Sequence, residues 1–255
     1  RDEAPMLYIG EKVGSGNGDE VDIALDPLEG TTITSKGMPN SLAVIAAAKK
    51  GCLLHSPDTY MNKIAIGNGY SNDVIDLDAS VKDNIKSLAD AKKVKPSDIS
   101  ACVLERDRHS EIIESLREIG SKVILIPDGD VAGVMMTSQE EIDVDIYFGT
   151  GGAPEGVLAA AALQCIGGQM QTRLVIRNDD EKKRAEKAGI KDLEKKYYID
   201  DLASGDIIFV ATGVTEGTMV KGVKKYSNSF LTHSIVLRSD FNTTQFIQTY
   251  HPQSI

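Results

Sequence analysis

Apolar and polar residues alternate along several short stretches of the chain, with the two-residue period of a half-buried β-strand. The alternation covers residues 21–26 and the carboxyl-terminal stretches 234–239 and 243–250, which favours antiparallel edge strands at the end of the chain. Further strands are predicted at 63–67, 101–105, 122–127, 144–152, 169–176 and 206–213. Residues 41–48 (SLAVIAAA) are predicted as a strand buried on both faces, with a short helix as the alternative.

Other segments repeat their apolar residues at the three-to-four-residue spacing of an amphipathic helix. One runs from 80 to 93, and a second, from 109 to 118, is followed by Gly120, a residue typical of a helix end. Shorter or more uniform segments predict helices at 131–137, 154–166 and 179–188. Pro154 falls in a first helical turn, where its missing N–H costs nothing.

Strands alternate with helices through most of the chain, and this order predicts a layered α/β or α+β fold. The length of 255 residues suits one large unit, so we expect a single unit over residues 1–255. Pro96 ends the helix predicted at 80–93, and the regular alternation begins after it. We therefore place a subdomain boundary there, between 1–96 and 97–255.

Composition narrows the possible partners. There are 28 Lys and Arg against 38 Asp and Glu, a formal net charge of −10, which argues against a general nucleic-acid binder because that function needs a basic face. No apolar run approaches the roughly 20 residues that span a bilayer, so we expect no membrane partner. Cys52, Cys102 and Cys165 are odd in number, widely spaced and set in apolar stretches, which indicates reduced thiols and a cytoplasmic location.

The segment Asp26-Pro-Leu-Glu29-Gly30-Thr31 directly follows a predicted strand. Pro and Gly favour a tight turn, and such a turn can aim Asp26 and Glu29 at one point beside Thr31. Two carboxylates at close range repel unless one is protonated or a cation lies between them. Oxygen ligands select Mg²⁺ or Mn²⁺ rather than zinc. The alternative is an ordinary surface turn.

Glycines end the strand predicted at 144–152, in the segment GTGGAPEG, and a helix follows. Free amides and the helix dipole make such a junction a ready anion site. Glu155 lies in the first helical turn, where its charge also suits the dipole without any ligand.

Two more strand ends carry polar clusters. Arg106-Asp107-Arg108 can offer two guanidinium groups to a phosphate, although salt bridges to nearby acids explain them equally well. Asp128-Gly129-Asp130 lies at the next strand-to-helix junction, where Asp130 suits an N-cap and Asp128 could accept a hydrogen bond from a ligand hydroxyl. Together with the acids and glycines above, these clusters supply the parts for metal-assisted hydrolysis of a sugar phosphate.

Long segments of the sequence resemble one family. DEAPMLYIGEKVG, DIALDPLEGT, PDTYMNKIAIG, PDGDVAG, GTGGAPEGV and ATGVTEG occur in this order along the chain. Together they resemble the class II fructose-1,6-bisphosphatases of the GlpX type, members of the metal-dependent, lithium-sensitive sugar and inositol phosphatase superfamily. The resemblance implies a layered αβαβα sandwich, an Mn²⁺- or Mg²⁺-dependent hydrolase, and a homodimer or homotetramer.

The resemblance also implies roles for individual residues. Asp26, Glu29 and Glu155 match metal ligands, and Thr31 matches the catalytic threonine. The substrate contacts implied by the family motifs are Glu29, Gly30, Thr31, Tyr60, Arg106, Asp107, Arg108, Asp128, Gly129, Asp130 and Gly152. Asp107 stands where the family commonly has proline. On this reading 1–96 holds most of the metal site and 97–255 most of the substrate site.

At its front the sequence departs from the family pattern, because it begins with Arg1 rather than with a segment carrying a GEGE motif. Asp2 matches an acidic position just after that motif, where a carboxylate assists catalysis. We therefore expect a longer parent protein in which an N-terminal segment completes the metal site.

The expected reaction is hydrolysis of the 1-phosphate of fructose 1,6-bisphosphate to fructose 6-phosphate and phosphate, in gluconeogenesis and glycerol metabolism. The alternatives are a related phosphatase acting on sedoheptulose 1,7-bisphosphate or inositol phosphates, and an inactive sugar-phosphate-binding fragment. The expected partner is a small sugar bisphosphate.

Overall fold

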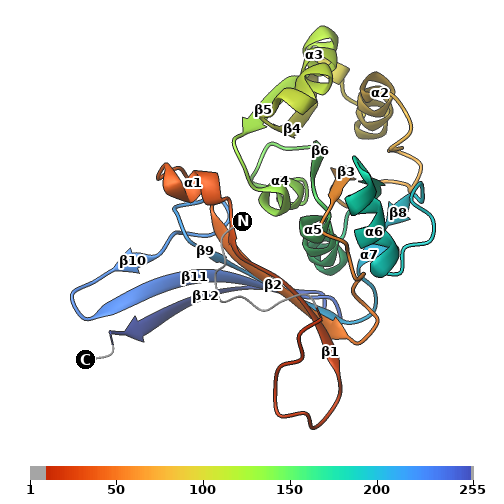
Figure 1. Ribbon diagram of the computed structural model, residues 1–255. Coiled ribbons are helices and arrows are strands. Elements are labelled where there is room, and N and C mark those ends of the chain that lie inside the picture. Colours follow the sequence, from red (N-terminus) through yellow and green to blue (C-terminus); the bar gives the residue numbers. More distant parts are fainter. Residues whose placement is uncertain (1–9, 254–255) are drawn as a thin grey trace.

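Two β-sheets and the helices around them make up the computed structural model, which describes residues 10–253 (Figure 1). The first sheet has the strand order β1-β2-β9-β11-β10, and β12 pairs with β11. Its strands are β1 (Val21–Glu29), β2 (Leu42–Lys49), β9 (Ile207–Gly213), β10 (Lys224–Lys225), β11 (Ser229–Arg238) and β12 (Thr243–Pro252). All of the pairings in this sheet are antiparallel.

The second sheet has the order β5-β4-β6-β3-β7-β8. Its strands are β3 (Tyr60–Ile66), β4 (Ser100–Leu104), β5 (Lys122–Ile126), β6 (Ile146–Gly152), β7 (Gln169–Val175) and β8 (Tyr197–Tyr198). Strand β4 runs parallel to both β5 and β6, whereas β3 runs antiparallel to β6 and β7. The sheet is therefore mixed, and the carboxyl ends of β4, β5, β6 and β7 and the start of β3 share one edge.

Helices fill the space between the sheets and cover the far side of the second sheet (Figure 1). The helices are α1 (Thr31–Ser35), α2 (Val81–Lys92), α3 (Ser110–Ile119), α4 (Asp130–Met136), α5 (Ala153–Ile166), α6 (Asp179–Lys187) and α7 (Ile199–Leu202). Residues of α4 and α5 share one apolar core with side chains from both sheets. A second core joins α2 and α3 to β3, β4 and β6. The predicted layered α/β sandwich is confirmed.

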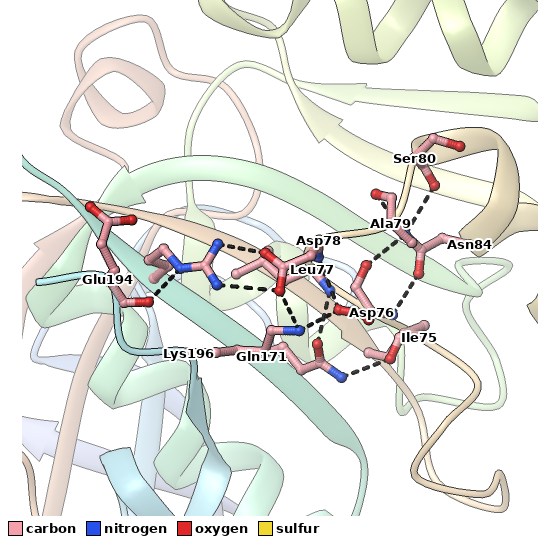
Figure 2. A network of polar contacts seen from close by, with 11 residues as sticks. Ile75, Asp76, Leu77, Asp78, Ala79, Ser80, Asn84, Gln171, Glu194 and Lys196 are labelled. Atoms are coloured by element: carbon pink, nitrogen blue, oxygen red, sulfur yellow. Dashed lines mark hydrogen bonds and ion pairs between the residues drawn. The ribbon is translucent and has the colours of Figure 1, made fainter. Parts of the chain in front are cut away.

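A polar network fixes the loop before α2 to the second sheet (Figure 2). Buried Gln171 on β7 accepts a hydrogen bond from Leu77 N (2.8 Å) and donates one to Ile75 O (2.7 Å). The carboxylate of Asp78 pairs with Arg173 (2.5 Å) and Lys196 (2.7 Å). These contacts give hydrogen-bond partners to backbone groups of the loop, which would otherwise be buried without them.

Most of the predicted elements are present. Residues 41–48 form a strand rather than a helix, but the prediction that both faces are buried is wrong, because Leu42, Val44, Ala46 and Ala48 face the core while Ile45 is 40% exposed. Gly120 ends α3 in the left-handed conformation (φ 81°), as expected.

Three findings bear on the wider predictions. Both sheets contain strands from each side of residue 96, and the subdomains 1–96 and 97–255 stay a prediction. Within residues 10–253, no helix is long and apolar enough to cross a membrane. Cys52, Cys102 and Cys165 are all free thiols.

Candidate active site

The DPLEGT segment forms the end of β1 and the start of α1. The pairing of β1 with β2 shifts register between Asp26 and Glu29, so a β-bulge turns the strand at this point. Gly30 follows with φ 83°, a left-handed conformation that favours glycine, and Thr31 is the exposed first residue of α1. Asp26 is half-buried, and its Oδ1 accepts a hydrogen bond from Leu28 N (3.0 Å). The segment is therefore more than a simple surface turn.

Glu29 is a buried carboxylate with only 3% of its surface exposed. Its Oε1 accepts a hydrogen bond from Val131 N at the start of α4, while its Oε2 has no hydrogen-bond partner among the described residues. Burial, with the nearby charges of Asp130, Asp26 and Glu155, raises the pKa of Glu29 to about 8. One oxygen of this carboxylate therefore accepts no hydrogen bond from the described residues, and the charges that raise its pKa are those of other acids.

Glu155 lies in the first turn of α5 and is half-buried. Burial raises its pKa, Lys63 opposes that shift, and the charges of Asp130 and Asp26 add to it. Gly152, which precedes α5, leaves room for this carboxylate: a Cβ on Gly152 would fall 1.9 Å from Glu155 Oε2. Gly152 therefore leaves space for the carboxylate of Glu155. The sequence around Gly152 did not by itself indicate this role.

A buried ion pair lies beneath these acids. Lys63 on β3 is 2% exposed, and its Nζ contacts Oδ2 of Asp130, the first residue of α4. Tyr147 Oη donates a hydrogen bond to Asp130 Oδ1 (2.5 Å). Burial alone would raise the pKa of Asp130, but Lys63 and the Tyr147 hydroxyl hold it below its usual value. Gly151 is required here, because a Cβ would fall 1.7 Å from Asp130 Oδ2.

Sequence reasoning missed Lys63 and Tyr147. Both lie inside strands of the second sheet, and because the strand was predicted at 63–67, Lys63 was expected at a strand end, where a lysine gives no signal of an internal cation. The N-cap interpretation of Asp130 is wrong. Asp130 is the first helical residue, with Gly129 (φ 97°) before it, and its side chain is taken by the ion pair.

Asp128 connects two of the predicted clusters. Its Oδ2 accepts a hydrogen bond from Thr32 N (3.3 Å), and its Oδ1 lies 3.5 Å from Arg106 Nη2. Arg106 also donates to the Pro127 carbonyl (2.5 Å). The structure therefore brings together DPLEGT, the arginine loop and the PDGD turn, and the guanidinium of Arg106 is partly engaged by protein groups.

Arg108 and Tyr60 lie side by side at the same sheet edge. Arg108 Nε donates to the Thr150 carbonyl (2.7 Å), and its Cζ lies 5.1 Å from the Tyr60 ring centroid. Tyr60 is the register partner of Gly152 across β3 and β6. Asp107 lies between the arginines and is exposed, at the start of the 3₁₀ turn Asp107–His109.

His109 is fully buried at the N-cap position of α3, and its side chain makes no capping hydrogen bond. Its Nε2 accepts a hydrogen bond from Thr150 N (2.8 Å), and Nδ1 lies 2.8 Å from the Leu104 carbonyl. These partners select the neutral Nδ1–H tautomer, and burial lowers the pKa of the ring. The ring ties the end of β4 to β6 and holds Arg108 next to it.

We tested whether the acids suit a divalent cation. Within residues 10–253, Glu29 Oε2 is a buried oxygen without a hydrogen-bond partner, and the charges of Asp130, Asp26 and Glu155 each raise the pKa of Glu29. All donors are carboxylates, which hard cations prefer. Across residues 10–253 no three His, Cys, Asp or Glu side chains are grouped as a formed metal site, so the donors fit by type without being closed around a point. Asp2 lies outside the described residues.

Comparisons with known proteins point to one family. Residues 1–251 match the family model of the bacterial fructose-1,6-bisphosphatase encoded by glpX. The fructose-1,6-bisphosphatase 1 class 2 of Escherichia coli K12 is 40% identical over 263 aligned residues, which cover 98% of this chain and 78% of that protein. The class 2 fructose-1,6-bisphosphatases of Escherichia coli O6:H1 and Shigella flexneri match with the same identity and coverage.

Proposed function

The chain belongs to the glpX-encoded family of bacterial fructose-1,6-bisphosphatases, and from this membership we propose how its residues carry out the family's reaction. It is a phosphoric monoester hydrolase that converts fructose 1,6-bisphosphate to fructose 6-phosphate and phosphate in gluconeogenesis. The observation that supports a site at this sheet edge is Glu29, a buried carboxylate whose Oε2 has no hydrogen-bond partner in the described part of the chain and whose pKa is raised by other acids nearby.

Enzymes of this class depend on a metal ion, and we assign Asp26, Glu29 and Glu155 as the residues that would hold Mn²⁺ or Mg²⁺ here. Such an ion, when bound, supplies Lewis-acid polarisation of the phosphate that is cleaved. Glu29 must lose its proton to serve as a ligand, and because its pKa is about 8 without metal, binding would release a proton. Asp2 is proposed to assist catalysis from the front of the chain.

Thr31 would act on the phosphate that is cleaved, as the nucleophile or by orienting water. Its position directly after the left-handed Gly30 supports this role, because Thr31 is exposed while Glu29 nearby is buried. Hydrogen bonds from the Gly30 turn would stabilise the charge that develops on the phosphate oxygens.

We assign the remaining contacts to the rest of the sugar bisphosphate. Arg106 and Arg108 would bind the distant phosphate, and Tyr60 and Asp107 are assigned as further substrate contacts. Asp128, Gly129 and Asp130 would accept hydrogen bonds from sugar hydroxyls, and Gly152 would contact the substrate through its backbone. The proximity of Asp128 to both Thr32 and Arg106 supports one continuous substrate site.

Phosphate release in the presence of Mn²⁺ tests these assignments on the full-length protein. Glu29→Ala should abolish activity, whereas the exposed Glu186→Ala on α6 should retain it. Full activity of Glu29→Ala would refute the metal assignment. A higher kcat/KM for sedoheptulose 1,7-bisphosphate or an inositol phosphate than for fructose 1,6-bisphosphate would instead show that this other compound is the preferred substrate.

The family resemblance also leads us to propose a cytoplasmic enzyme that contributes to glycerol metabolism and assembles as a homodimer or homotetramer. The three free cysteines agree with a reducing compartment. Light scattering on the purified protein would give the oligomeric state, and a monomer at micromolar concentration would contradict the proposed homodimer or homotetramer.

A further inference from the structure

Arg177 lies beside the candidate active site but belongs to none of the motifs above. It follows β7 and precedes Asn178, the N-cap of α6. Strand β7 pairs with β3 so that Val175 is the register partner of Tyr60. Residues 175–177 therefore leave the sheet at the edge where Tyr60 and Gly152 lie.

Two guanidinium groups approach the ring of Tyr60. Arg177 Cζ lies 4.1 Å from the ring centroid, closer than Arg108 Cζ at 5.1 Å. Both distances are within the range of cation–π attraction, so the tyrosine holds two positive charges at one place. Like charges gathered in this way repel each other unless an anion binds between or beside them.

A buried carboxylate holds Arg177 in this position. Glu181, only 1% exposed, accepts hydrogen bonds from Arg177 Nε (2.9 Å) and Nη2 through Oε1, and from Arg177 N (2.8 Å) through Oε2. Glu181 is in turn fixed by its own N–H, which donates to Asn178 Oδ1 (2.9 Å). The Arg177 side chain remains 50% exposed. The guanidinium is thus oriented before any ligand arrives, yet solvent reaches it.

Arg184, the other arginine that contacts Glu181, is engaged by a second acid, because its Nη1 lies 3.7 Å from Asp58 Oδ2. The guanidinium groups described at the Tyr60 ring are those of Arg108 and Arg177. An exposed, fixed guanidinium presents its N–H groups to a phosphate in matching planar geometry.

We propose that Arg177 is a further substrate-binding residue, which joins Arg108 at Tyr60 to bind the phosphate that the enzyme does not cleave, with Glu181 as its positioning residue. This inference rests on the proposed function, because it assumes a bisphosphate whose second phosphate lies at Tyr60. The ligand chemistry is a phosphomonoester dianion on a sugar carbon.

Steady-state kinetics of Arg177→Gln on the full-length enzyme test the proposal. Losing one charged phosphate contact should raise KM for fructose 1,6-bisphosphate about 10- to 100-fold, with kcat changed by less than about threefold. Fructose 6-phosphate, which carries only the uncleaved phosphate, should inhibit the variant about 10-fold less strongly, while inhibition by inorganic phosphate should not change. Arg177→Lys should restore part of the affinity, because it keeps the charge but loses the planar fork.

Arg184→Gln is the matched control. Arg184 contacts the same Glu181 (3.9 Å) from α6 and has no ring contact with Tyr60 among those described, so its KM should match wild type. An unchanged KM in Arg177→Gln would overturn the proposal. So would an equal weakening of inhibition by fructose 6-phosphate and by inorganic phosphate. Failure of the wild-type enzyme to hydrolyse fructose 1,6-bisphosphate would instead overturn the proposed function, and isothermal titration with fructose 6-phosphate would still report on Arg177.

Discussion

Replacing Lys63 by methionine tests how strongly the buried ion pair supports the site. Methionine keeps most of the volume and the unbranched stem of lysine while removing the charge. The Lys63 side chain is fully inaccessible and that of Asp130 is 6% exposed. Without Lys63, the carboxylate of Asp130 would keep Tyr147 Oη (2.5 Å) but would lose its closest positive charge.

The expected cost follows from this burial. Removing one partner of a buried ion pair costs about 3–5 kcal/mol, because the other charge remains without compensation. For a protein of this length, each kcal/mol lowers Tm by about 2–4 °C, so Lys63→Met should melt about 6–20 °C lower. Asp130→Asn in the same chain should recover part of the loss, since the double variant no longer buries a lone charge.

Urea and thermal unfolding followed by circular dichroism, without divalent ions, would measure these values. The control is Lys122→Met, which removes a solvent-exposed pair with Asp143 (3.0 Å, side chains 59% and 71% exposed). Such a pair contributes about 0–1 kcal/mol. If Lys63→Met costs no more than Lys122→Met, the reasoning from burial is wrong.

Two further predictions concern the acids and glycines around this pair. Since burial raises the pKa of Glu29 from 4.5 to about 8, the folded metal-free protein holds a proton that the unfolded chain releases, and its stability should fall as pH rises between these values. Thermal melts across this range should show a steeper fall in stability in wild type than in Glu29→Gln; equal slopes would contradict the prediction. Gly151→Ala should destabilise by about 2 kcal/mol or more, because its Cβ would displace Asp130 Oδ2, and should cost more than Gly189→Ala, where nothing lies within 4 Å and only the left-handed backbone (φ 85°) is strained.

Hydrophobic periodicity was sufficient for most of the fold. The helical spacing at 109–118 reflects one buried face, whereas the strand predicted from the alternation at 243–250 forms with both faces largely exposed. Both elements formed with ends within two residues of prediction. Residues 41–48 show the limit of this approach. Alanines are apolar enough to suggest burial on both faces yet small enough to remain partly exposed, so only the inward face at Val44 and Ala46 is closed.

The candidate site was less predictable because its support is buried. Motifs at strand ends identified Glu29, Asp128 and Gly152, and the structure brings their segments to one sheet edge. Nothing in the pattern of KIAIG distinguished Lys63 as an internal cation from a lysine at a strand end. The neutral tautomer of His109 depends on Leu104 and Thr150, which lie in different strands, and such partners are set by tertiary structure.

Charge balance at the site explains why these buried groups occur together. Asp26, Glu29, Asp130 and Glu155 influence one another electrostatically, and among the described residues Lys63 is the one buried lysine close to them. That ammonium holds the pKa of Asp130 low, but it does not prevent a raised pKa at Glu29 and Glu155. The ammonium of Lys63 is therefore enough to keep Asp130 ionised, so that Asp130 can accept hydrogen bonds from sugar hydroxyls. It does not offset the raised pKa of Glu29 and Glu155. A divalent cation or a proton must balance the remaining negative charge of these acids. Metal binding at Glu29 is therefore coupled to proton release.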